Sequence, residues 1–236
     1  RFQNRVPKFG EINHHGNKLL NMIKCVHEMQ EVGVKELMSS FRCDNIGEFW
    51  LSGLIIAPLE SAALFEFFGR IENLQFLGIH SCTMEHSAFK ELANLLKKEN
   101  TIEDLMIVNC RISDDDAKRV IDALTNENCK VTSLDLAYNE LTAKSAKYLR
   151  DTLRSINCKL TELSLSENEL NDTGVKYLSE ALMDKNCKLT KLGLNENEIT
   201  DKGAKYLSRA LTNGNCKLAK LCLNENEITN KGAKYL

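Results

Sequence analysis

The sequence CKLTKLGLNENEITDKGAKYL, residues 187–207, decides how this chain must fold. It returns at residues 216–236 as CKLAKLCLNENEITNKGAKYL, 29 residues further on, with three differences in 21 positions. Self-similarity at a fixed period of this length indicates a chain built from stacked repeats, each of which forms one supersecondary unit.

The repeated phrase follows the rule L-x-x-L-x-L-x-x-(N/C)-x-L, in which x is any residue. Neighbouring copies are offset by 28 residues in the first two steps and by 29 residues in the other four. Seven copies, the first of them degenerate, begin at Ile46, Leu74, Ile102, Val131, Leu160, Leu189 and Leu218. On this pattern the chain is identified as a member of the leucine-rich-repeat class.

Each repeat is predicted to hold one strand and one helix. Leu192 and Leu194 alternate with polar residues, as in a short strand with one buried face. Thr200 is a good helix-capping residue and precedes a run with helical spacing. Asn197 lies between these segments, where its amide can bond the backbone of its own and neighbouring turns. This polar slot holds Leu54, Cys82, Cys110, Asn139, Asn168, Asn197 and Asn226.

The predicted fold is an α/β, right-handed leucine-rich-repeat solenoid with the shape of a horseshoe. Paired strands lie about 4.8 Å apart, whereas packed helices need roughly 8–10 Å. The stack must therefore bend, with parallel strands on the concave face and helices on the convex face. We expect strands centred near Trp50, Gly78, Met106, Asp135, Ser164, Gly193 and Cys222.

Two regions are expected along the chain. Residues 46–236 form the repeat domain of seven repeats, the last of them truncated, and we expect the natural protein to continue beyond it. Residues 1–45 form a lead-in and a helical N-terminal cap, because apolar residues recur at helical spacing in residues 18–30 and 34–41. Such a cap would cover the apolar face of the first repeat.

Composition limits the partners and the compartment. A net charge of −2 does not specifically imply nucleic acid as a partner. No apolar run approaches the roughly 18 residues of a membrane span, so no membrane association is expected. Four of the nine cysteines occupy one repeat position, which indicates packed, reduced thiols and a cytoplasmic location. These four are Cys129, Cys158, Cys187 and Cys216.

No enzymatic activity is expected. None of the five histidines has a metal-ligand spacing to a cysteine or to another histidine, and no Ser/His/Asp or Cys/His set is indicated. The phosphate-binding sequence G-x-x-x-x-G-K-[ST] does not occur in these residues. We therefore expect no catalytic residue, no metal site and no cofactor.

The repeat lengths and the recurring N-C-K-L entry resemble the ribonuclease-inhibitor class of leucine-rich repeats. Residues 19–41, LLNMIKCVHEMQEVGVKELMSSF, resemble the helical segment that precedes the repeats of NOD-like receptors. The shared feature is a spacing of Cys, Glu and Gln, represented here by Cys25, Glu28 and Gln30.

This resemblance implies a non-enzymatic sensor or autoinhibitory region of a cytosolic innate-immune receptor. Its partner would be a protein ligand, or another domain of the same receptor, on the concave face. One alternative is a ribonuclease-inhibitor-like scaffold that binds a basic protein, although the uniform 29-residue offsets depart from the alternating rhythm of ribonuclease inhibitor. Another alternative is a leucine-rich-repeat adaptor in a different assembly.

The predicted contact surface is the concave face. Counting from the first residue of the rule, positions 3, 5, 7, 8 and 10 are expected to project from it. The N-terminal half is apolar and aromatic, whereas the C-terminal half is acidic. The alternatives are that repeat duplication copied the glutamates without a ligand, and that Trp50 packs under the N-terminal cap. The predicted partner-binding residues are Trp50, Phe76, Met106, Tyr138, Glu140, Glu167, Glu169, Glu196, Glu198, Glu225 and Glu227.

Overall fold

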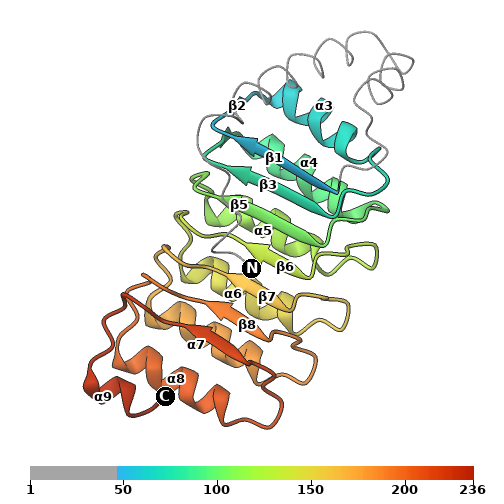
Figure 1. Cartoon of the computed structure of the whole chain (residues 1–236). Coiled ribbons are helices and arrows are strands. Elements are labelled where there is room, and N and C mark those ends of the chain that lie inside the picture. Colours follow the sequence, from blue (N-terminus) through green and yellow to red (C-terminus); the bar gives the residue numbers. More distant parts are fainter. Residues whose placement is uncertain (1–46) are drawn as a thin grey trace.

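A computed structural model describes residues 47–236 as strand–helix units stacked along one axis (Figure 1). One parallel sheet contains seven strands in chain order, so the predicted α/β solenoid is confirmed. Residues paired across this sheet include all seven predicted strand centres, from Trp50 to Cys222. The strands are β1 (Glu48–Ser52), β3 (Phe76–His80), β5 (Asp104–Val108), β6 (Ser133–Asp135), β7 (Glu162–Ser164), β8 (Lys191–Gly193) and β9 (Lys220–Cys222).

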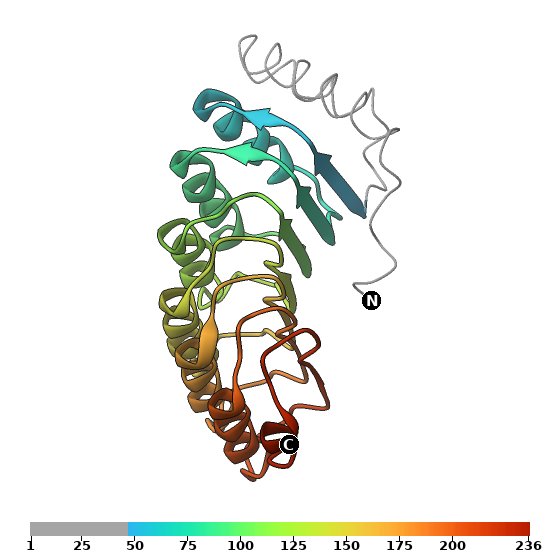
Figure 2. The same ribbon diagram turned by 90° about the vertical axis from the view of Figure 1, so that its left-hand side faces the viewer.

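A helix follows each of these strands and packs on the opposite side of the stack. Figure 2 shows the helices along the outer side and the strands along the inner side of a bent arrangement. The short strands β2 (Ile55–Ile56) and β4 (Thr83–Met84) form a second parallel pair. The helices are α3 (Pro58–Phe68), α4 (His86–Lys97), α5 (Asp114–Ala123), α6 (Ala143–Leu153), α7 (Asn171–Leu182), α8 (Asp201–Leu211) and α9 (Asn230–Ala233).

The N-terminal cap predicted for residues 1–45 lies outside the described residues, as do its two expected helices. Within residues 47–236, no helix has the length and apolar character needed to cross a membrane. The packing role predicted for four cysteines is confirmed for Cys129, Cys158 and Cys187, whose free thiols are buried, whereas the free Cys216 of the last repeat is only half-buried. Burial raises the pKa of each of these thiols.

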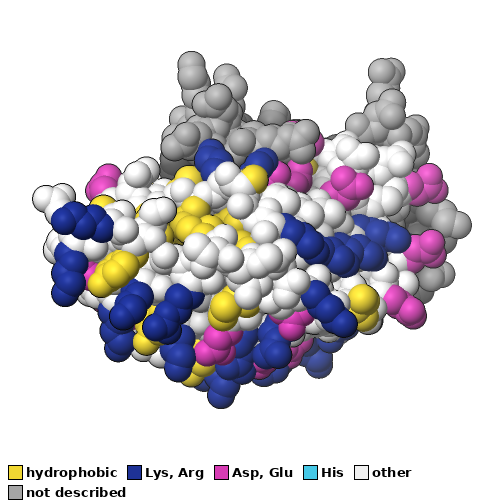
Figure 3. All heavy atoms as spheres, turned by 90° about the horizontal axis from the view of Figure 1, so that it is seen from below, with side chains coloured by type: hydrophobic (Ala, Val, Ile, Leu, Met, Phe, Trp, Pro, Cys, Tyr) yellow, Lys and Arg dark blue, Asp and Glu magenta, His cyan; other side chains and the backbone are white. Residues whose placement is uncertain are grey.

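The interior is a continuous stack of leucines, in which each repeat covers the next. Leu192 and Leu194 of the sixth repeat are fully buried, whereas Leu221 and Leu223 of the seventh are half-buried. Figure 3 shows hydrophobic side chains gathered in the middle of this C-terminal end, with Lys and Arg side chains on both sides. Burial in this fold therefore depends on a neighbouring repeat, as it does in other solenoids.

The predicted asparagine ladder is present. The Asn168 side-chain amide donates to the Leu136 carbonyl at 3.0 Å, and its oxygen accepts from the Leu141 N–H at 3.0 Å. Asn139 and Asn197 make the same kind of bonds to the repeat before them. These asparagines are buried, so they satisfy backbone groups that water does not reach.

Cysteine replaces asparagine in this slot, as the sequence analysis expected. The Cys110 thiol donates to the Val108 carbonyl at 3.3 Å and to the Ile79 carbonyl at 3.6 Å. A thiol is a weaker donor than an amide and offers no strong acceptor for the preceding repeat. The N-terminal repeats are therefore joined by fewer bonds at this slot than the C-terminal repeats.

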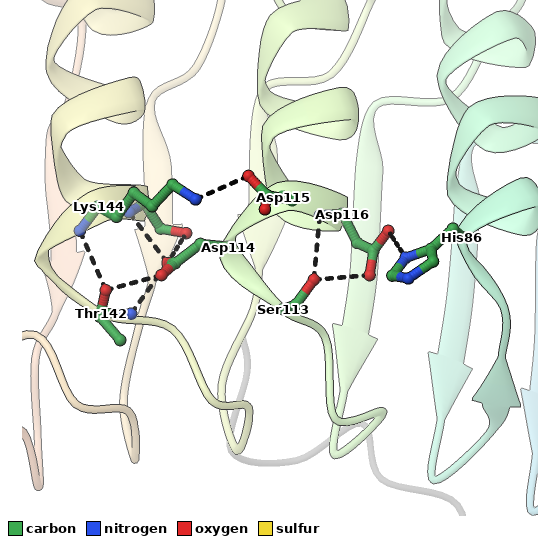
Figure 4. Close-up of polar contacts among 8 residues, drawn as sticks. His86, Ser113, Asp114, Asp115, Asp116, Thr142 and Lys144 are labelled. Carbon is green, nitrogen blue, oxygen red and sulfur yellow. Dashed lines mark hydrogen bonds and ion pairs between the residues drawn. The ribbon is translucent and has the colours of Figure 1, made fainter.

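A second ladder, which the sequence analysis did not predict, joins the starts of neighbouring helices (Figure 4). The Asp114 carboxylate accepts from the Thr142 N–H at 3.0 Å, from the Thr142 hydroxyl at 2.7 Å and from the Ser145 N–H at 3.0 Å. Each aspartate thus caps the first turn of the following helix, whose N–H groups lack partners within the helix. The same bonds recur in the pairs Asp172–Thr200 and Asp201–Thr229.

This aspartate ladder has one gap and one steric requirement. Ala143 occupies the aspartate position of the fourth repeat, so the next helix, α7, receives no aspartate cap from the preceding repeat. Its first residue, Asn171, has φ of 49° and accepts the Thr173 N–H on its own side chain at 2.8 Å. In the sixth repeat, the Gly203 N–H donates to Asp172 at 2.8 Å. A Cβ on Gly203 would lie 2.5 Å from the Ile199 side chain and 2.6 Å from the Asp172 carboxylate, so both side chains would have to shift to admit it.

Candidate recognition groove

A groove of about 310 Å³ runs along the concave face across the last four repeats. Its floor is low because small side chains occupy position 5, at Ser164, Gly193 and Cys222. The same position carries Trp50 and Met106 in the first and third repeats. The hollow therefore follows from the local sequence of position 5, and it lies where the sequence analysis expected the acidic half of the face.

One rim of the groove consists of Tyr138, Glu167 and Glu196 at position 8. Glu225 continues the same position in the seventh repeat, and we call Glu167, Glu196 and Glu225 the glutamate column. These residues were predicted to project from the concave face. The structure places them in the loop after each strand, because β6 to β9 end at position 5.

The backbone at position 8 is in the left-handed region in every described repeat. The φ values are 57° at Tyr138, 55° at Glu167, 51° at Glu196 and 55° at Glu225. Most residues other than glycine, asparagine and aspartate adopt this conformation only where surrounding structure fixes it. The Glu167 N–H donates to the Asn195 carbonyl at 2.8 Å, and the Glu196 N–H donates to the Asn224 carbonyl at 3.0 Å. Bonds between repeats thus hold the rim in place.

The charges on this rim interact with one another. Local desolvation raises the pKa of Glu196, and the neighbouring carboxylates Glu167 and Glu225 raise it further. A hydrogen bond to Glu167 is the main reason why the pKa of Tyr138 rises to about 12. None of the ion pairs found within residues 47–236 involves the glutamate column. The rim therefore presents unneutralised negative charge.

Four further predicted glutamates lie at position 10, outside the lining of the groove. All four side chains are exposed, and they form a second acidic row beyond the glutamate column. We call them the outer glutamates: Glu140, Glu169, Glu198 and Glu227.

The opposite side of the groove carries cations at position 3. Lys191 forms an ion pair with Glu162 at 2.6 Å, whereas Lys220 has no partner among the ion pairs of the described repeats. Both lysines line the groove. The concave face is thus negative along one rim and positive along the other in the sixth and seventh repeats. The sequence contains this signal, because Lys191 and Lys220 share one repeat position, but the predicted contact residues did not include them.

Asp135 on the groove floor was also absent from the predicted contact residues. Its side chain is 5% exposed and accepts from the Ala137 N–H at 3.0 Å. Burial is the main cause that raises the pKa of Asp135, although bonds from Ala137 and Ser164 lower it. Asp135 therefore places a buried, hydrogen-bonded carboxyl group in the floor of the groove.

The apolar half of the predicted contact surface is largely covered in this structure. Phe76 is 3% exposed and Met106 is 5% exposed, so both side chains are buried, and their role in binding stays a prediction. They form a separate apolar cluster with Val108 and the half-buried Trp50, whose ring lies 4.6 Å from that of Phe76. Tyr138 is the exception, because 52% of it is exposed beside the groove.

The polar cluster at the start of α5 contains a histidine, an aspartate and a serine, but not in the order of a catalytic triad. Asp116 lies between His86 and Ser113, with contacts of 2.6 Å and 2.7 Å (Figure 4). The imidazole therefore does not contact the serine hydroxyl that it would have to activate. Among residues 47–236, no group of His, Cys, Asp and Glu side chains is placed to hold a metal ion.

Comparison with known proteins identifies the repeats. A family described as "Leucine Rich repeat" matches residues 127–149, 157–179, 185–208 and 214–236. These four segments are leucine-rich repeats. They include the glutamate column and all the residues that line the groove. No curated protein matches this chain.

Several solved structures are similar to this chain. "Leiomodin-1 Actin-Binding Site 2 (ABS2)" is 20% identical, with a TM-score of 0.43, over 54% of this chain and 75% of that chain. The tropomodulin C-terminal domain of Caenorhabditis elegans is 17% identical, with a TM-score of 0.46, over 75% of this chain and 90% of that chain. An internalin of Listeria monocytogenes is 16% identical, with a TM-score of 0.23, over 97% and 95% of the two chains.

Proposed function

We propose that this chain is a non-enzymatic protein-recognition module whose concave groove binds a basic segment of a partner protein. The observation that carries the proposal is the glutamate column, which stands on a fixed rim with no ion pair in the described repeats. Local desolvation and, after it, the repulsion from Glu167 and Glu225 raise the pKa of Glu196, and a cation bound between these carboxylates would relieve that repulsion. Leucine-rich repeats are generally binding scaffolds for proteins, in agreement with this role.

Charge in this groove should act mainly on the rate and selectivity of association. Complementary charge steers a partner toward its site, whereas the rate of dissociation depends more on desolvated contacts. Tyr138 is placed to provide such a contact, because its exposed ring stands at the end of the glutamate column.

Charge reversal tests the proposal. Proteins captured by the parent chain are purified, and their association rates are measured at low and physiological salt. Reversal of the glutamate column (Glu167→Lys, Glu196→Lys and Glu225→Lys) should slow association and flatten its salt dependence, because steering is lost. Unchanged association of all captured partners would overturn the proposal.

The matched control reverses three exposed glutamates away from the groove. Glu72, Glu99 and Glu127 are exposed and form none of the ion pairs found in the described repeats, so their reversal changes the net charge equally. The association rates of this control variant should stay near those of the parent chain. Equal slowing by both triple variants would show an effect of net charge rather than of the groove.

We also propose that this recognition module is a region of a NOD-like receptor. The resemblance of residues 19–41 to the segment before the repeats of NOD-like receptors supports a sensor or autoinhibitory role in the cytoplasm. The buried free cysteines agree with a reducing compartment. The partner would then be a protein ligand or another domain of the same receptor. The complete open reading frame tests this context, because a NOD-like receptor requires a nucleotide-binding domain upstream of the repeats.

A further inference from the structure

The spacing of charge along the groove limits which kind of segment can occupy it. Successive strands of a parallel sheet lie about 4.8 Å apart. The position-8 residues keep this stacking, because the N–H groups of Tyr138, Glu167 and Glu196 each donate to a carbonyl of the next repeat. The groove therefore offers one carboxylate about every 5 Å along its axis.

An α-helix matches this spacing better than an extended chain. A helix rises about 5.4 Å per turn, so side chains one turn apart differ from the groove spacing by about 0.6 Å. Side chains on one face of an extended chain recur every two residues, or about 6.6–6.8 Å. Across the three glutamates of the column, the helix is out of register by about 1.2 Å and the extended chain by about 4 Å. A flexible lysine side chain can reach its glutamate more easily across the smaller mismatch of the helix than across the larger mismatch of the extended chain.

The width and the second rim also suit a helix. Position 3 and position 8 are five residues apart, which sets an upper limit of about 17 Å on their separation, and the strand itself ends at position 5. A helix with its side chains is about 10–12 Å wide, which is below this limit. The groove of about 310 Å³ has room for the side chains on the face of the helix that points toward the sheet. The side chains along the two edges of the helix would then contact the two rims of the groove.

We infer that the groove receives an α-helix of a partner protein, which lies along the axis of the solenoid. One edge of this helix carries Lys or Arg once per turn, at i, i+4 and i+7, against the glutamate column. The other edge carries a carboxylate against Lys220. This inference rests on the proposed function, and it adds the secondary structure and the charge pattern of the occupant.

Two synthetic probes with three lysines each test the inference on the 236-residue chain. The helical probe carries its lysines on one edge and a glutamate on the opposite edge. The extended probe carries its lysines at every second residue, with prolines that prevent a helix. Calorimetry at low salt should show that the helical probe binds at least about tenfold more tightly. Reversal of the glutamate column should abolish the binding of this probe.

A second variant tests the opposite rim. Lys220→Glu should weaken binding of the helical probe and should have less effect on a helical probe whose glutamate is replaced by glutamine. If both probes bind equally and depend on the glutamate column, the helix is overturned while the basic-segment function stands. If neither probe binds, both the inference and the choice of the groove as the recognition site fail.

Discussion

Replacement of Asn168 by leucine tests the ladder that joins the concave repeats. The Leu141 N–H donates to the Asn168 side chain and has no other acceptor in the described part of the chain. The Asn168 amide donates to the carbonyls of Leu136, Leu165 and Ser166. Each of these carbonyls also accepts a second bond from another group. Asn168→Leu therefore leaves one buried N–H unpaired and weakens three shared contacts.

An unpaired buried N–H costs about 1–3 kcal/mol, and we add about 1 kcal/mol for the shared contacts. The predicted loss of unfolding free energy is about 2–4 kcal/mol, which lowers the melting temperature by roughly 5–10 °C in a chain of this size. Urea denaturation followed by circular dichroism and by tyrosine fluorescence measures the change. Asn224→Leu is the control, because Asn224 is exposed and its side chain forms none of the described hydrogen bonds. Equal midpoints for Asn168→Leu and the parent would refute the energetic role of the ladder.

Three further substitutions test other parts of the structure. Gly203→Ala should destabilise the chain by about 1–3 kcal/mol in urea denaturation because its Cβ has no room, whereas Gly214→Ala, in open space, should be neutral. The double change Ala143→Asp with Asn171→Thr should close the gap in the aspartate ladder and raise the unfolding free energy by about 1 kcal/mol; no gain would contradict the capping role. Asp135→Asn should be more stabilising at pH 7 than at pH 3, because a raised native pKa means that the parent loses stability as pH rises. A pH-independent difference would show that the carboxylate does not titrate with folding.

Features that recur once per repeat could be predicted from the sequence, because the same residue type appears at the same position of successive repeats. Asn139, Asn168 and Asn197 share one slot, and their bonds follow from stacking equal units. The aspartate ladder was equally periodic at Asp172 and Asp201, but its partners lie in the next repeat. A contact between repeats becomes visible only when the register of the stack is known.

The shape of the candidate site was harder to predict. The left-handed backbone at position 8 is suggested by Gly53 and Asn109, which favour that conformation, but Glu196 does not favour it. The groove depends on the small side chains of Ser164 and Gly193 in successive repeats, which the sequence analysis treated only as strand centres. The burial of the apolar half depends on contacts between different repeat positions, so periodicity alone did not reveal it.

Site-specific photo-crosslinking in cells tests most directly whether the groove is the recognition surface. A photoreactive side chain is placed at Ser166 in the groove or, as a control, at Ile156, which is 71% exposed on the loop between α6 and β7. The account predicts a discrete crosslink from position 166 to a basic helical segment of a protein, and its loss when the glutamate column is reversed. Crosslinks from position 156 alone, or crosslinks from position 166 that survive the reversal, would contradict it.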